Sequence, residues 1–299
     1  MQNIKRKGLS SAAKFWLFVS PWIIGFLCFT AIPMVVSIVL SFTKARVSTL
    51  MRKPLEFVGF LNYKEMFTVD KLILRSIGNT FVYSFAKVFL SILFGLLAAL
   101  LLNCKYKGRN IFRTLIYTPC IIPAVASGLL LQLIFFQDRS LLVYVFDALG
   151  IGRLQFGSKQ LAMPTIILSG AILGIGGNMV MILAGLQSVP SDIMEAAELD
   201  GAGGLKKLWY ITLPMISPTL FFMMVTGFIG GLQAYAEIEL VTGRSEYTMT
   251  MTMFVMDNAF GGIGMCYACA AAWIIFGVIL AFTMIFYKIT IKRVFYMGE

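Results

Sequence analysis

Six long runs of apolar residues dominate the chain, and the segments between them hold most of its charges. A helix needs about 20 apolar residues to cross about 30 Å of hydrocarbon. Only helices and closed barrels satisfy their backbone groups in lipid, and these runs are too long for barrel strands of about ten alternating residues. We therefore expect an all-α membrane protein with a single transmembrane domain over residues 1–299. Its six predicted transmembrane helices cover about 15–42, 80–102, 115–136, 163–186, 215–236 and 268–290.

The composition supports a membrane location. Hydrophobic residues make up 59% of the 299 residues and charged residues only 13%, whereas a soluble domain is about 45–50% apolar and about 25% charged. This balance excludes intrinsic disorder and an ordinary soluble domain. The first run is much longer than the roughly 7–15 apolar residues of a secretory signal, so we interpret it as a retained first helix.

The basic residues predict the orientation, because cytoplasmic loops are enriched in Lys and Arg. They cluster at the N-terminus, after the second and fourth predicted helices and in the C-terminal tail, and six helices place all four clusters on one face. We expect that face, with both termini, to be cytoplasmic. The loop 43–78 on the other face is also basic, but long loops count less. The net charge of +11 therefore requires no nucleic acid as a partner. The cytoplasmic clusters contain Lys5, Arg6, Lys7, Lys14, Lys105, Lys107, Arg109, Arg113, Lys206, Lys207, Lys288, Lys292 and Arg293.

Residues for catalysis or metal binding are scarce. The chain has no His, which removes the commonest general base and metal ligand. Cys266 and Cys269 form a C-x-x-C pair without a second pair, so we expect packed thiols and no metal site. The phosphate-binding motif G-x-x-x-x-G-K-[ST] does not occur. An intramembrane enzyme is the remaining alternative, and it is disfavoured because no two carboxylates share a predicted span.

The segment 188–214 between the fourth and fifth helices has an unusual local pattern. Pro190, Ser191 and Asp192 are residues typical of a helix start. Gly201 stands where a left-handed helix stop is expected, and residues 205–211 can form a second helix before Pro214 opens the fifth span. The pattern predicts a short helix, a glycine turn and another short helix on the cytoplasmic side. Local physics alone allows a mere connector as readily as a functional loop.

The spacing within this loop favours a function. Its residues are similar in identity and spacing to the EAA signature of permease subunits in binding-protein-dependent ABC importers. Resemblance to the carbohydrate-uptake branch, that of the maltose and glycerol-phosphate importers, extends over nearly the whole chain, including Ser41-Phe42-Thr43, 57–63, Asn79-Thr80, 100–103 and 184–190. One departure is Arg244-Ser245-Glu246, where the family often has further glycines and a proline. The signature residues are Glu195, Ala196, Ala197, Gly201, Ile211, Leu213 and Pro214.

The resemblance implies a non-catalytic subunit of a bacterial inner-membrane importer. It would form half of the pathway with a second, homologous permease, and an external solute-binding protein would deliver a sugar. Two ABC ATPase subunits would bind ATP and Mg, and this chain would bind no cofactor. The helix with Glu195, Ala196 and Ala197 would sit in an ATPase cleft, Glu195 and Asp200 offering charge contacts. Importers of glycerol phosphate, peptides or polyamines share the EAA loop and remain alternatives.

Polar and small residues inside the spans are candidates for the substrate pathway. For the glycines the alternative is close helix packing, which we favour, and for the polar residues the two interpretations are nearly even. Lys87 could snorkel to the outer interface, which we favour, or face the pore. Glu237 and Glu239 are expected to be solvated, with contact to the binding protein as an alternative, and 247–260 to form a short external helix. The pathway candidates are Gly174, Asn178, Thr226, Gly230, Gln233 and Tyr235.

Overall fold

A computed structural model describes residues 10–44, 55–104, 106–136, 140–150, 156–261 and 264–293. The basic residues Lys5, Arg6, Lys7 and Lys105 lie outside these ranges. The chain divides into two compact units, Met1–Thr68 with Met256–Trp273 and Val69–Val255 with Ile274–Glu299. We describe each unit by itself. The prediction of an all-α membrane protein is confirmed, since four helices can span a membrane, or six if each of two bent pairs counts as one span.

The first unit begins with one long apolar helix. α1 (Ser11–Phe26), the π-helical turn η1 (Leu27–Ala31) and α2 (Ile32–Ser41) form the candidate span Lys14–Ser41. Its side chains are mostly exposed in this chain, as expected of apolar residues that face lipid or another subunit. A two-residue antiparallel pair, β1 (Thr43–Lys44) with β2 (Glu56–Phe57), and α3 (Leu61–Thr68) follow. The Asn62 amide of α3 donates to the carbonyls of Ser41 (2.7 Å) and Thr43 (2.9 Å), which fixes the end of the helix.

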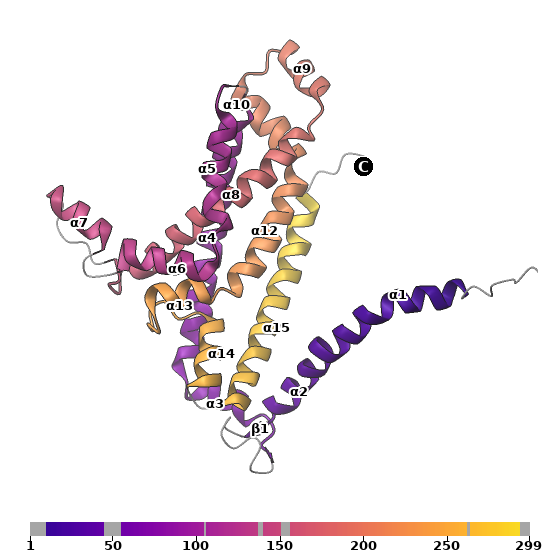
Figure 1. The fold of residues 1–299 in the computed structure, drawn as a ribbon, viewed down its shortest axis with the longest axis vertical. Helices are drawn as coiled ribbons and strands as arrows, with labels where there is room; N and C mark the ends of the chain where they lie inside the picture. Colours follow the sequence, from indigo (N-terminus) through magenta and orange to yellow (C-terminus); the bar gives the residue numbers. More distant parts are fainter. Residues whose placement is uncertain are drawn as a thin grey trace, which may run out of the picture. The chain divides into compact units, whose positions relative to one another are not determined.

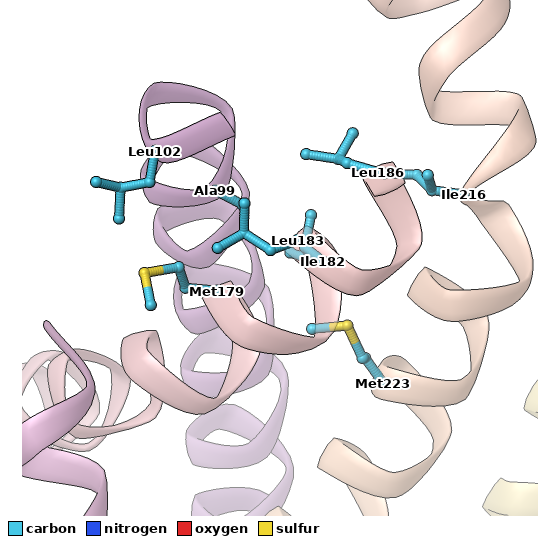
Figure 2. Close-up of a cluster of buried hydrophobic side chains, with 8 residues drawn as sticks. All are labelled: Ala99, Leu102, Met179, Ile182, Leu183, Leu186, Ile216 and Met223. Carbon is cyan, nitrogen blue, oxygen red and sulfur yellow. The ribbon is translucent and has the colours of Figure 1, made fainter. Parts of the chain in front are cut away.

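The second unit is built on three packed helices, α4 (Lys71–Asn103), α8 (Ala162–Gln187) and α12 (Ser217–Leu232). Their contact is an apolar cluster with contributions from all three and from Ile216 at the start of α12 (Figure 2). Because α8 carries small and branched residues along its length, it approaches α4 closely. The cluster residues are Ala99, Leu102, Met179, Ile182, Leu183, Leu186, Ile216 and Met223.

α4 begins nine residues before the predicted start at residue 80. The Asp70 carboxylate caps it by accepting a hydrogen bond from the Leu72 amide at 3.0 Å. Polar residues of this first part, such as Ser76, are buried, so they look unlike a membrane span in the sequence and still pack inside the protein.

Two of the six predicted spans are broken. α5 (Arg109–Ile121) and α6 (Ala124–Leu131), which continues in η2 (Gln132–Phe136), meet at 96° around Pro123. Proline cannot donate a backbone hydrogen bond, so the helix stops there. α7 (Leu141–Ala148) follows. The segment of α10 (Gly204–Lys207), η3 (Leu208–Thr212) and α11 (Leu213–Met215) meets α12 at 65°.

The predicted fifth span also ends early. α12 stops at Leu232, and α13 (Ala236–Thr242) starts as a separate helix after a short break. α6 and α13 pack together (Figure 1), and the Cβ that Gly128 lacks would lie 2.9 Å from the Cβ of Leu240. The second half of the broken third span, α6, is therefore packed against α13, the short helix that follows α12.

The predicted helix within 247–260 exists as α14 (Met251–Phe260), ahead of the last span α15 (Met265–Thr290) and the turn η4 (Ile291–Arg293). Its first residue is fully buried and packs with Leu232 and Ile275. The Thr80 hydroxyl accepts from the Met251 amide at 2.9 Å, and the Asn79 amide donates to the Met249 carbonyl at 3.0 Å. Asn79 and Thr80 thus fasten the start of α14 to α4.

We expect Thr80→Val to destabilise the protein by about 1–3 kcal/mol, because it leaves the buried Met251 amide without an acceptor. Thermal unfolding of the purified protein measures this effect. Thr114→Val is the matched control, since Thr114 also donates to the carbonyl four residues earlier but is exposed. Equal melting temperatures of the two variants would contradict the role of Thr80.

Candidate transport pathway and coupling helix

The predicted helix, turn and helix are present in the segment between α8 and α12. α9 (Ser191–Leu199) follows Pro190 in extended conformation, and Gly201 has φ +73°. The Ala202 amide donates to the Ala197 carbonyl and the Gly201 amide to the Glu198 carbonyl, the bonds of a Schellman turn. Gly201 therefore sets where α9 ends and where the chain turns toward α10. Figure 1 shows α9 projecting beyond the ends of α8 and α12.

The signature residues divide into an exposed group and a packed group. Glu195, Ala196 and Asp200 are exposed, whereas Ala197 is buried. Leu199 is 89% exposed, so an apolar side chain stands in the open beside the acidic ones. The packed group lies at the bend into α12, where Leu213 packs against the apolar cluster and both Ile211 and Pro214 are half-buried. One group can meet a partner while the other connects to α12.

An ion pair that the sequence analysis missed braces this loop. The Lys207 ammonium lies 2.5 Å from the Glu198 carboxylate and joins α10 to α9. The hydrogen bond and the charge of Lys207 lower the pKa of the exposed Glu198 carboxyl. Neither residue belongs to the EAA spacing, and their distance of nine positions across a glycine turn gives no helical periodicity. Only the fold of the turn brings them together.

Three pathway candidates lie along one open stripe formed by α12 and its C-cap residue Gln233. Thr226, Gly230 and Gln233 are exposed and follow one another at four and three residues, the spacing of one helix face. About a quarter of a turn around the helix, a Cβ at Gly227 would lie 3.2 Å from Val88, and one at Gly231 would lie 3.0 Å from Ser84. The neighbouring glycines thus serve packing, and Gly230, with no atom within 4 Å of a Cβ, does not.

The two candidates on α8 lie at its contact with α4. A Cβ at Gly174 would lie 3.2 Å from the Ser91 Cβ, and one at Gly95 would lie 2.6 Å from the Asn178 Cβ. Both positions therefore carry a packing role. Tyr235, in the break after α12, is half-buried. The structure brings Thr226, Gly230 and Gln233 onto one face and places Gly174 and Asn178 at a helix contact.

Lys87 and Glu237 form an ion pair inside the second unit. The Lys87 ammonium lies 3.4 Å from the Glu237 carboxylate, and the side chains are 22% and 36% exposed. The Tyr83 hydroxyl is 3.5 Å from the same carboxylate oxygen. Both charged residues line a pocket of about 240 Å³. Lys87 thus lines a pocket within this chain and has an acidic partner there. Glu237 is paired where we expected solvation.

Comparisons with known proteins agree with this architecture. The family model described as "Binding-protein-dependent transport system inner membrane component" matches residues 91–296. The probable ABC transporter permease protein YesP of Bacillus subtilis (strain 168) is 34% identical over 305 residues, which cover 100% of this chain and 96% of YesP. The multiple sugar-binding transport system permease protein MsmF of Streptococcus mutans is 35% identical over 230 residues, covering 75% and 78% of the two chains.

A solved structure has the same fold. A bacterial ABC transporter involved in the import of the acidic polysaccharide alginate contains a chain that superposes with a TM-score of 0.80 over 96% of both chains, at 22% identity. The family model covers more than half of this chain, and the alignment with YesP covers all of it. This chain therefore belongs to the family of inner membrane components of binding-protein-dependent transport systems.

Proposed function

We propose that the chain is the transmembrane subunit of a carbohydrate ABC importer and forms half of the translocation pathway. The observation that carries this proposal is α9, which exposes Glu195 and Ala196 beyond the ends of α8 and α12. The helix ends in a turn at Gly201, whose positive φ only a glycine adopts without strain. Relatives named for sugar transport, such as MsmF and the arabinooligosaccharides transport system permease protein AraP of Bacillus subtilis, support a sugar as the solute. A glycerol-phosphate importer is the second candidate, since the permease protein UgpA of Agrobacterium fabrum is 27% identical.

The partners follow from this role. Two ATPase subunits bind ATP and Mg, and one of them receives α9 in a cleft. Glu195 and Asp200 provide charge contacts there, and Leu199 provides an apolar one. A second permease completes the pathway beside the open stripe of Thr226, Gly230 and Gln233. A solute-binding protein delivers the sugar from the outside, and both termini face the cytoplasm. The ion pair of Glu198 with Lys207 joins α9 to α10, and movement of the ATPases reaches α12 through the bend at Leu213 and Pro214.

ATP-driven sugar uptake by the complete complex in vesicles tests this proposal. We expect Gly201→Val to lower uptake by up to about tenfold, because a Cβ at positive φ costs roughly 1–2 kcal/mol and shifts the loop away from its docked geometry. Glu195→Lys should lower uptake as well, since it reverses the charge that meets the ATPase. Gly203→Val is the matched control, because Gly203 has φ −66° and no atom within 4 Å of a Cβ. Unchanged uptake by both variants, Gly201→Val and Glu195→Lys, in a complex that still assembles would mean that the loop only connects α8 to α12.

A further inference from the structure

The pocket beside Lys87 lies at two interruptions of the helices, the break around Pro123 and the break between α12 and α13. Pro119, Ile122 and Ala124 line it from the break around Pro123, and Glu237 lines it from the first turn of α13. Irregular backbone at membrane depth is tolerated where it is packed in protein or lines a cavity, and transport sites are typically formed by discontinuous helices. This placement points to a site for solute that is distinct from the open stripe on α12.

The ion pair has free capacity for a ligand. Its 3.4 Å distance is longer than the roughly 2.7–2.9 Å of a strong charge-assisted hydrogen bond. Lys87 has three N–H donors and Glu237 has two acceptor oxygens, so part of their capacity is unused toward the pocket. Ser127 adds a hydroxyl to the lining. The pocket therefore offers both donors and acceptors, which is what a ring of hydroxyl groups requires.

The volume and the charge of the pocket limit which ligands can bind there. The volume of about 240 Å³ is below the roughly 300–1,000 Å³ of pockets for larger ligands, so it suits one sugar unit rather than an oligosaccharide. Among the described residues that line it, only Lys87 and Glu237 are charged, and their charges cancel. The described lining residues therefore include no second cation that could neutralise a carboxylate or phosphate group on the solute.

We propose that Lys87 and Glu237 form a solute-binding site that holds one uncharged sugar unit through its hydroxyl groups. This inference rests on the proposed function, because it assigns a binding site and a chemical class to the solute that the importer transports. The alternative is that the pair only braces α4 against α13. The two interpretations differ in what a reciprocal exchange of the charges does, since an exchange keeps the brace and reverses the positions of donor and acceptor.

Cys120 provides the readout, because it lines the same pocket and is exposed. In the purified complex, the rate of its alkylation by N-ethylmaleimide is followed by mass spectrometry with increasing glucose, galactose or arabinose, and with glucuronate as the charged counterpart of glucose. The exposed Cys104, which is not among the lining residues, is the internal control. At least one of the uncharged sugars should slow the alkylation of Cys120 and leave that of Cys104 unchanged.

We expect Lys87→Gln, Glu237→Gln and the exchange Lys87→Glu with Glu237→Lys each to raise the half-protecting sugar concentration by at least about tenfold, the loss of one hydrogen bond to a charged group. The matched controls are Lys71→Gln, at an exposed position of α4, and Glu246→Gln, at an exposed ion pair. In both control variants, the sugar concentration that half-protects Cys120 should equal that of the unchanged protein.

Four outcomes would contradict the proposed site. The first is an unreactive Cys120, because a pocket that is closed to a small reagent cannot admit a sugar. The others are protection by glucuronate alone, full protection by sugar in the Gln variants, and full recovery of protection in the charge-exchange variant. ATP-driven uptake of a wider panel of sugars by the same preparation distinguishes a failure of this site from a failure of the proposed function. Uptake without protection of Cys120 contradicts this site and leaves the proposed function standing, whereas absence of any sugar uptake contradicts the proposed function.

Discussion

Replacing Gly176 with Ala is expected to destabilise the protein by about 2–3 kcal/mol or more, the upper part of the range for overpacking. The Cβ of an alanine at this position would lie 2.5 Å from the Ile116 carbonyl oxygen and 2.8 Å from the Tyr117 Cα. Both neighbours are backbone atoms of α5, so no side chain can rotate away. α5 and α8 would have to separate, and the contacts around Gly176 would be lost with them.

The apparent melting temperature of the purified protein measures this effect. Gly277→Ala is the matched control, because Gly277 also lies inside a spanning helix and a Cβ there meets no atom within 4 Å. The control should melt at the same temperature or slightly higher, since alanine favours the helix over glycine. A Gly176→Ala variant as stable as the control would mean that α5 and α8 are farther apart than the structure places them.

Removing one member of the pair formed by Lys87 and Glu237 is the second large expected effect. Breaking a buried ion pair costs about 3–5 kcal/mol because an uncompensated charge remains. The side chains are 22% and 36% exposed, so water screens part of this cost, and we expect about 1–3 kcal/mol for Lys87→Met or Glu237→Leu alone. The double variant should recover most of the loss, since no charge is then left unpaired.

Thermal unfolding of the two single variants and the double variant forms a cycle that isolates the coupling between them. The exposed pair of Arg75 with Glu246, also 3.4 Å apart, gives the matched control, and removing Glu246 there should change the stability by less than about 1 kcal/mol. Additive effects of Lys87→Met and Glu237→Leu would show that the two charges do not support each other. This cycle reports on stability only, and the protection of Cys120 reports on the binding of solute.

The features that depend on neighbouring residues could be predicted from the sequence. Apolar runs of about 20 residues determined the number and order of the spans, because burial in lipid is a property of each segment by itself. Gly201 could be recognised as the end of α9 since a left-handed stop depends on neighbouring residues only. The spacing of Glu195, Gly201 and Pro214 identified the family by resemblance, and the comparisons bear out that assignment.

Tertiary structure decided how these segments meet. Pro123 in the sequence allowed either a kink or a break, and packing of α6 on α13 accompanies the bend of 96°. Gly176 and Gly230 look alike in the sequence, yet one lies against the backbone of α5 and the other in open space. Lys87 finds its partner 150 residues further along the chain, and Lys207 finds Glu198 across a turn. Contacts between distant segments depend on how whole helices pack, whereas the spans and the turn at Gly201 depend on adjacent residues, and for that reason only the latter could be predicted from the sequence.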